Sequence, residues 1–445
     1  MTTQDNYTLL QKYPTQVPRY TSYPTAPHFK PMDVGTHREW LAEIPEDAPV
    51  SLYLHIPYCQ KLCWFCGCHA KVAHGYDKVS TYLEALIKEI RLVRRQLKRN
   101  QRVAHIHFGG GSPTMLSGDD FSRIMRELNE SFALDADAEI AIEIDPRTIT
   151  EGKIAAYAKY GVNRVSIGVQ DFDPAVQKAI NRVQPLSTVY EALRLCRNYD
   201  IDAISLDLVY GLPLQTLQGF LDTVEYALAL KPSRIALFGY AHVPWKKKQM
   251  QLINDADLPD DRTRMHLAQE AARRINAAGY VTIGLDHFAK PDDAMAIALE
   301  RHTLRRNFQG YTTDTSEVLI GLGTSAISSF DQGYTQNAVK IEEYEQSLAE
   351  DKLATIRGIE LTDDDKIRRA IIESLMCYYD ADIALFDLDS TGIRSQLTPL
   401  IADGLASFSG TILQVNRDVP QACRLVCAAF DHYFNASAQR HGQVA

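Results

Sequence analysis

Up to residue 284, short apolar runs alternate with longer segments whose apolar residues recur at helical spacing. The short runs predict six strands, at 52–56, 105–108, 139–144, 164–169, 203–209 and 234–238. The longer segments predict helices at 79–97, 118–132, 150–160, 174–180, 188–198, 217–229 and 263–278, before a last extended segment at 280–284. This alternation is typical of a parallel sheet with helices on its outside.

Two parallel folds compete at this point. An open doubly wound sheet would carry a GxGxxG turn after its first strand, and this chain has a cysteine-rich loop there instead. The polar motifs described below follow or end strands, which is where a barrel places its site. We therefore predict an α/β fold, a partial (β/α)6 barrel of the TIM type.

The two ends of the chain do not show this alternation of strands and helices. Residues 1–50 form an irregular arm, rich in Pro and Tyr, with a short helix at 37–42. Residues 51–350 are expected to form the catalytic domain, and 351–445 a small helix-rich domain that is poor in strands. In that domain we expect segments 353–361 and 363–376, a short strand at 408–415, a closing helix at 419–434 and a disordered tail.

Composition narrows the class of partner. The 445 residues carry a formal net charge of −9, which argues against non-specific binding to nucleic acid. An anionic ligand would therefore need a local basic pocket. We see no secretory signal and no apolar stretch that could span a bilayer, so we expect a cytoplasmic protein, and we expect a monomer.

Half of the eight cysteines lie within ten residues, as Cys59, Cys63, Cys66 and Cys68. The first three have CxxxCxxC spacing, and thiolates are good ligands for iron–sulfur clusters. A loop with three ligands would leave one iron of a cubane open to a small chelating molecule. A structural zinc site usually has two cysteine pairs with a longer spacer, and four ordinary buried thiols are the other alternative.

Further polar or small residues stand at the strand ends that follow. Three glycines before Ser112 end the second strand and would let the backbone approach a ligand closely. Glu143 ends the third strand, and Asp207 interrupts an apolar run in the fifth, where a lone charge needs a partner. Asp145 and Arg147 can simply pair with each other.

The segment from Tyr53 through His55-Ile56-Pro57 to Cys66-Gly67-Cys68 resembles the radical S-adenosylmethionine (SAM) superfamily. Within it, the chain is similar to the family of oxygen-independent coproporphyrinogen III oxidases, also called coproporphyrinogen dehydrogenases. The resemblance covers most of residues 10–330. It implies that Cys59, Cys63 and Cys66 bind a 4Fe–4S cluster, with Cys68 beside the cofactor.

The resemblance also implies a set of SAM contacts. The residues expected around the cluster-bound SAM are Tyr53, Gly110, Glu143 and Ile327. Those expected around a second SAM are Phe65, Gly111, Ser112, Gln170, Arg182, Asp207 and Ala241.

The implied activity belongs to haem biosynthesis. A SAM-derived 5′-deoxyadenosyl radical removes hydrogen from the β-carbon of a propionate of coproporphyrinogen III. Loss of carbon dioxide and one electron then gives a vinyl group, and two rounds give protoporphyrinogen IX. An electron donor and a final acceptor, both unidentified, are needed as partners. No general base is assigned, because this chemistry needs none.

Segments 18–25, 284–293 and 306–313 resemble the family outside the predicted strands. Their aromatic and amide residues suit a lid over a large flat ring, with the N-terminal arm over the active site. Arginine favours bidentate contacts with carboxylates such as propionates. The candidate substrate contacts are Arg19, Tyr20, His287, Arg305, Arg306 and Gln309. The simpler alternatives are that the arginines are ordinary surface charges and that His287 makes only structural hydrogen bonds.

Two other functions remain open from the sequence. A haem-binding chaperone on the same scaffold would share the cysteine loop but lack Cys66-Gly67-Cys68 and the segment 307–313, both of which are present. A non-catalytic iron–sulfur or zinc protein would bind metal without cleaving SAM.

Overall fold

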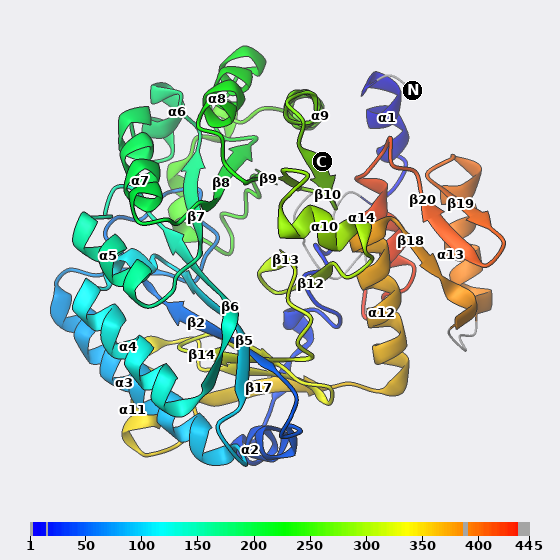
Figure 1. Ribbon diagram of the computed structural model, residues 1–445. Helices are drawn as coiled ribbons and strands as arrows, with labels where there is room; N and C mark the ends of the chain where they lie inside the picture. Colours follow the sequence, from blue (N-terminus) through cyan, green and yellow to red (C-terminus); the bar gives the residue numbers. More distant parts are fainter. Residues whose placement is uncertain (1–2, 15–16, 386–389, 435–445) are drawn as a thin grey trace.

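The computed structural model describes residues 3–14, 17–385 and 390–434. Within these residues the main sheet has 13 strands, and its central part is parallel (Figure 1). The parallel strands, in spatial order, are β14 (Val318–Leu322), β2 (Val50–Ile56), β5 (Arg102–Gly110), β6 (Ala133–Ile144), β7 (Arg164–Gln170), β8 (Ala203–Tyr210) and β9 (Arg234–Gly239). The six predicted strands are thus confirmed. β14 was not predicted.

The predicted helices are confirmed, and those that connect the strands lie along the outside of the curved sheet (Figure 1). They are α3 (Tyr76–Gln96), α4 (Gly118–Ser131), α5 (Glu151–Lys159), α6 (Pro174–Ala179), α7 (Leu186–Asn198), α8 (Leu217–Ala229) and α9 (Asp261–Ala277). In α3, for example, Leu83, Leu86 and Ile90 are buried against the sheet, as their helical spacing requires.

The sheet continues in antiparallel strands at both edges, so its parallel part is a partial barrel. Beyond β9 lie β11 (His287–Ala289) and β10 (Val281–Ile283), the latter within the segment expected at 280–284. Beyond β14 lie β15 (Ile327–Ser329), β16 (Gly333–Asn337), β17 (Thr355–Glu360) and β1 (Lys30–Pro31).

Segment 353–361 was expected in a helix-rich module, and this expectation was wrong. Thr355–Glu360 forms β17, which pairs with β16 on one side and with β1 on the other. Backbone partners on both sides favour the strand, and they come from parts of the chain that the local pattern does not reveal.

The C-terminal module contains α12 (Asp363–Tyr378), α13 (Ser390–Ala402), α14 (Ala422–Ala428) and a three-stranded sheet. The sheet has the order β18 (Asp380–Asp382), β20 (Ile412–Val415), β19 (Ala406–Ser409). Segment 408–415 is therefore a hairpin and not one strand, because Gly410 at φ 63° reverses the chain. The helix expected at 419–434 is restricted to α14, which Pro420 precedes. The tail expected to be disordered, 435–445, lies outside the described residues.

The N-terminal arm packs against this module. It contains α1 (Thr3–Leu10), which was not predicted, and α2 (Val34–Glu43), which confirms the helix expected at 37–42. Five arm side chains share one core with α12, α14 and the three-stranded sheet, namely Leu9, Leu10, Val17, Tyr20 and Tyr23. The division of the chain near residues 50 and 350 stays a prediction.

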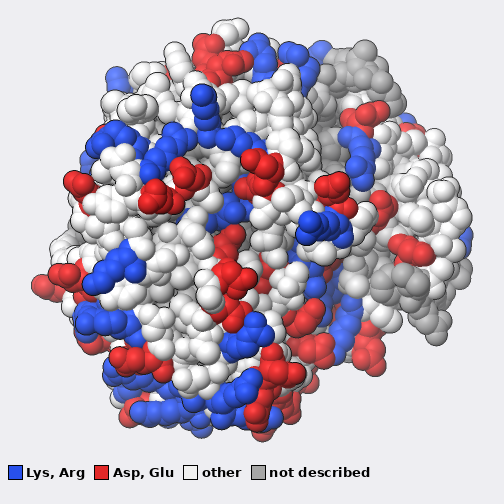
Figure 2. Space-filling view, in the orientation of Figure 1, with Lys and Arg blue, Asp and Glu red and all other residues white. Residues whose placement is uncertain are grey.

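Acidic and basic side chains are interspersed over the face seen in Figure 2. Across the described ranges, no helix combines the length and the apolar character needed to cross a membrane.

Candidate active site

The cysteine loop follows β2 and opens into a cleft at the carboxyl ends of the parallel strands. The cleft has an empty volume of about 1330 Å³ and is open to solvent. Cys59, Cys63, Cys66 and Cys68 all line it, and all four thiols are free of disulfides. The loop therefore presents its sulfur atoms to one shared space, as a cluster-binding loop requires.

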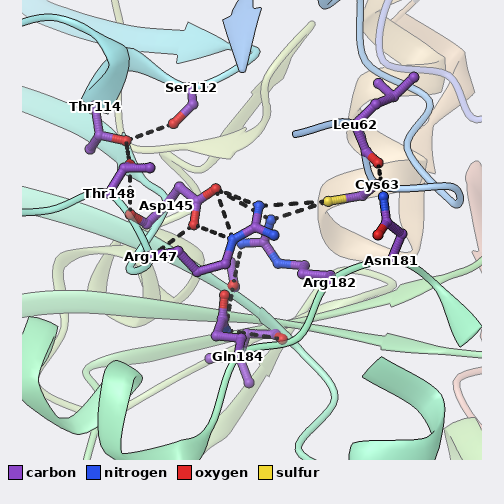
Figure 3. A network of polar contacts seen from close by, with 12 residues as sticks. Leu62, Cys63, Ser112, Thr114, Asp145, Arg147, Thr148, Asn181, Arg182 and Gln184 are labelled. Atoms are coloured by element: carbon purple, nitrogen blue, oxygen red, sulfur yellow. Dashed lines mark hydrogen bonds and ion pairs between the residues drawn. The ribbon is translucent and has the colours of Figure 1, made fainter. Parts of the chain in front are cut away.

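The backbone of the loop is held by side chains and backbone groups from two distant segments. After β7, Asn181 Nδ2 donates to Leu62 O at 2.9 Å (Figure 3). In the same region, Trp64 N donates to Ile180 O at 3.0 Å. After β9, Gln249 Nε2 donates to Cys66 O at 2.7 Å. These bonds fix the course of the loop without using any of its sulfur atoms.

Two guanidinium groups approach one thiol. Arg182 Nη1 lies 3.5 Å from Cys63 Sγ, and Arg147 Nη2 lies 3.8 Å from it (Figure 3). Arg147 also pairs with Asp145 at 2.6 Å, which confirms the simple ion pair anticipated for these two residues. Both guanidinium groups therefore place positive charge beside the cysteine loop.

The surroundings of Cys66 favour its thiolate form. A hydrogen bond from the Cys68 side chain, followed by the nearby charges of Lys247 and Arg182, lowers the pKa of Cys66 to about 6, although burial opposes this. Burial raises the pKa of Cys59 to about 12, so the local environment favours the thiolate, which is the ligating form, at Cys66 and not at Cys59.

The glycine run comes so close to its neighbours that side chains would not fit. A Cβ on Gly111 would stand 2.8 Å from Tyr58 O, and one on Gly109 would stand 2.8 Å from Glu143 Oε1. Gly110 has φ +113° and donates its N–H to Glu143 Oε2 at 3.3 Å. Main-chain groups can thus line the cleft directly, as the sequence predicted for this turn.

Most of the predicted cofactor contacts come together around this cleft. Those lining it, besides the cysteines, are Phe65, Gly110, Gly111, Ser112, Glu143, Gln170, Arg182, Asp207 and Ala241. Two predicted contacts, Tyr53 and Ile327, are not among the lining residues. Tyr53 lies behind the glycine run, where its hydroxyl pairs with His55 Nδ1 at 2.9 Å, and Ile327 lies in β15. Whether all of these residues contact SAM stays a prediction.

Asp207 is a partly buried carboxyl group that lines the cleft from β8. Burial, with a smaller contribution from the charge of Glu143, raises the pKa of Asp207 to about 7, and Arg182 opposes the shift. A carboxyl group in this environment gains from a polar ligand that donates hydrogen bonds to it.

The six candidate substrate contacts do not form a single group. Arg19 lines the cysteine cleft, and with Arg306 it also lines a neighbouring pocket. Tyr20 and Arg305 line a third cavity, where Arg305 pairs with Glu373 at 2.9 Å and with Glu317 at 3.3 Å. Two of the candidates, His287 and Gln309, line a polar cavity within the barrel.

The donor set fits an iron–sulfur cluster. Among the residues that the structure describes, no three His, Cys, Asp or Glu side chains converge closely enough to ligate a single ion. The three thiolates of a cubane site bind different irons, so they need not converge on one ion. Three free thiols in one cleft, two guanidinium groups at Cys63 and a glycine wall beside them suit a negatively charged sulfur cluster.

Sequence reasoning missed several residues that shape this region. Lys247 and Gln249 hold the loop through its backbone, and Lys247 Nζ donates to Cys68 O at 2.8 Å. Arg264 and Arg424 line the pocket next to the cleft. Each of them lies far along the chain from the cysteines, and no local motif marks any of them.

Comparisons with known proteins agree with this geometry. Residues 53–227 match the sequence profile described as the Radical SAM superfamily. The structure of a coproporphyrinogen III oxidase from Escherichia coli, described as a radical SAM enzyme, superposes with a TM-score of 0.89 at 38% identity. That match covers 96% of this chain and 98% of the other. The fold, the cysteine loop and these matches define a radical SAM enzyme.

Full-length relatives identify the family. The oxygen-independent coproporphyrinogen III oxidase of Bradyrhizobium diazoefficiens is 47% identical over 436 residues, which cover 96% of this chain and 97% of the relative. The one from Paracoccus denitrificans is 39% identical over 446 residues, which cover 98% and 99%. The chain belongs to the family of oxygen-independent coproporphyrinogen III oxidases.

Proposed function

We propose that this protein decarboxylates two propionates of coproporphyrinogen III to vinyl groups without oxygen, giving protoporphyrinogen IX. The observation that carries the proposal is the cleft in which Cys59, Cys63 and Cys66 face the glycine run and Asp207. The names of the relatives described above support the choice of substrate.

In this proposal the three thiolates hold a 4Fe–4S cluster, and the SAM contacts are those that line the cleft. When bound, the cluster and SAM supply a 5′-deoxyadenosyl radical that removes hydrogen from the substrate. The protein positions the reacting propionate and keeps water away from the radical. Gly110, Gly111 and Glu143 offer backbone and carboxylate groups to the polar ends of SAM.

A second SAM beside the first is part of the proposal, since the lining residues extend from the cysteines across to Asp207 and Ala241. We also propose a cytoplasmic, monomeric enzyme that is served by an unidentified electron donor and acceptor. All eight cysteines are free thiols, which suits a reducing compartment.

The test is an anaerobic assay of the cluster-loaded protein with coproporphyrinogen III, SAM and a reductant. We expect 5′-deoxyadenosine and protoporphyrinogen IX from the wild type, and neither product from Cys63→Ala. Cys196→Ala is the matched control, because Cys196 is a buried thiol on α7, remote from the loop in sequence, and it should retain both products. Tight haem binding without SAM cleavage would overturn the proposal in favour of a haem chaperone.

A further inference from the structure

A second pocket, with an empty volume of about 960 Å³, adjoins the cysteine cleft. Its wall includes four separate parts of the chain that carry arginine, namely the N-terminal arm, α9, β12 (Arg305–Asn307) and α14. Each part contributes one arginine, and we call this the arginine pocket, formed by Arg19, Arg264, Arg306 and Arg424.

Backbone carbonyl groups orient two of these guanidinium groups from the end of β9. Arg19 Nη2 donates to Gly239 O at 2.9 Å, and Arg264 Nη2 donates to Tyr240 O at 2.6 Å. A carbonyl group is neutral, so these two contacts orient the guanidinium groups without cancelling their charge.

The other two arginines are oriented by the arm. Arg424 Nε donates to Pro18 O at 3.0 Å, and Arg306 Nε donates to Tyr20 O at 3.2 Å. Arg306 also stacks over the Tyr311 ring, 4.3 Å from its centre. Its Nη1 is buried and has no hydrogen-bond partner within the described residues, which is costly unless a ligand supplies one.

Among the described residues, the pocket has fewer negative than positive side chains. Asp286 is the one carboxylate of those residues that lines it, and His287 Nδ1 already pairs with this carboxylate at 2.7 Å. Burial, and then repulsion from Arg19, lowers the pKa of Arg424 to about 10. Arg19 and Arg424 therefore repel each other, and an anionic ligand would relieve that repulsion.

The pocket and the cleft lie next to each other. Arg19, Gly239, Tyr240 and Ala241 line both of them. A ligand that occupies both spaces would extend from the arginines to the cysteine loop.

We infer that the arginine pocket binds carboxylate groups of the tetrapyrrole, and so holds non-reacting propionates while another propionate lies at the cysteine cleft. This inference rests on the proposed function. It adds Arg264 and Arg424 to the substrate contacts and leaves out Arg305, which two glutamates already engage. Guanidinium groups bind carboxylates bidentately, which also fixes the orientation of the ring.

The test measures binding of coproporphyrin III, the stable oxidised form of the substrate, to cluster-loaded protein by fluorescence. Its tetramethyl ester, in the same detergent-containing buffer, has the same ring but no carboxylate charge. Arg19→Gln and Arg264→Gln should each weaken coproporphyrin III binding about tenfold or more, and should leave the weak binding of the ester nearly unchanged. Arg417→Gln is the matched control.

The control residue makes the same kinds of contact outside the pocket. Arg417 Nη2 donates to Tyr378 O at 2.7 Å, and its guanidinium lies 5.7 Å from the centre of the Tyr379 ring. Arg417→Gln should therefore bind coproporphyrin III as the wild type does. Equal loss in all three variants would indicate general damage and would overturn the assignment of the pocket.

Other outcomes separate this inference from the proposed function. If the wild type converts coproporphyrinogen III but Arg19→Gln and Arg264→Gln keep full affinity, the pocket inference is wrong and the proposed function stands. If these variants weaken SAM binding and leave coproporphyrin III binding intact, the anion held there is the SAM carboxylate, and the inference is likewise wrong. A wild type that cleaves SAM but neither binds coproporphyrin III nor converts coproporphyrinogen III overturns both.

Discussion

The pKa of Asp207 reflects the environment inside the cleft. Its carboxyl group lies on β8 among apolar neighbours, with Glu143 as the nearby negative charge and Arg182 as the nearby positive one. Burial outweighs the attraction of Arg182, so the protonated form persists near neutral pH.

This shift has a consequence for stability. Because the pKa of Asp207 rises from 3.8 to about 7 on folding, the folded state binds more protons than the unfolded state between these values. The contribution of Asp207 to the free energy of unfolding therefore falls as the pH rises from about 4 to about 7, and it no longer changes above pH 7.

An asparagine at this position does not ionise, so Asp207→Asn does not lose this stability. The variant should be more stable than the wild type by up to about 4 kcal/mol at pH 8, and by less at pH 5.

Urea unfolding of cluster-free protein at the two pH values measures the effect. Asp202→Asn is the control, because Asp202 is exposed just before β8 and its change should be the same at pH 5 and pH 8. Equal effects of Asp207→Asn at both pH values would contradict the prediction.

At the scale of elements, Glu89 joins α3 to the antiparallel edge of the sheet. Its carboxylate accepts hydrogen bonds from Gly323 N at 2.6 Å, Asn337 Nδ2 at 2.6 Å and Tyr344 Oη at 2.7 Å. These partners come from the turn after β14, from β16 and from α11 (Ile341–Ala349). One buried side chain therefore ties the strand that begins the parallel sheet to its antiparallel extension.

Glu89→Leu leaves three buried donors without their acceptor. We expect the free energy of unfolding to fall by about 3–5 kcal/mol, measured by urea denaturation at pH 7. On the same helix, Glu84 is exposed and pairs with Arg123, so Glu84→Leu should cost less than about 1 kcal/mol. Similar losses in the two variants would show that the network around Glu89 does not stabilise the fold.

Helices and strands could be predicted where the local pattern of apolar residues determines them. The six core strands and their helices follow from apolar runs and helical spacing, and the cysteine loop follows from a spacing that is complete within ten residues. β14 and β17 were missed or assigned wrongly, because their pairing partners come from distant parts of the chain. For the same reason, the hydrogen bonds from Arg264 to Tyr240 and from Arg424 to Pro18 could not be predicted from the sequence alone.

At the scale of the whole molecule, the two ends of the chain stabilise each other. Tyr20 Oη donates to Asp431 Oδ2 at 3.1 Å, and Asn6 Nδ2 donates to Asp418 O at 3.2 Å. Leu9 and Leu10 are buried in the core that α12 and α14 also form. The arm therefore belongs energetically to the C-terminal module, although the whole barrel lies between them in sequence.

Leu10→Asp places a charge in this shared core, where Leu10 is 5% exposed. We expect the C-terminal module to open more often and to be cut by protease at least about tenfold faster than in the wild type, as mass spectrometry of the fragments would show. Leu252→Asp is the control, because Leu252 is 60% exposed and should leave the cleavage rate unchanged. Cleavage that stays at the wild-type rate in Leu10→Asp would mean that the arm does not support the module.

The bond from Arg424 to Pro18 spans 406 positions, nearly the full length of the chain. During synthesis the ribosome adds the cysteine loop long before it adds Arg424, so the loop is present in the nascent chain before the arm can form its bond to α14. A polypeptide that stops short of Arg424 would lack one wall of the arginine pocket. Translation thus sets an order, in which the cysteine loop is made first and the arginine pocket can be completed only after Arg424 has been added.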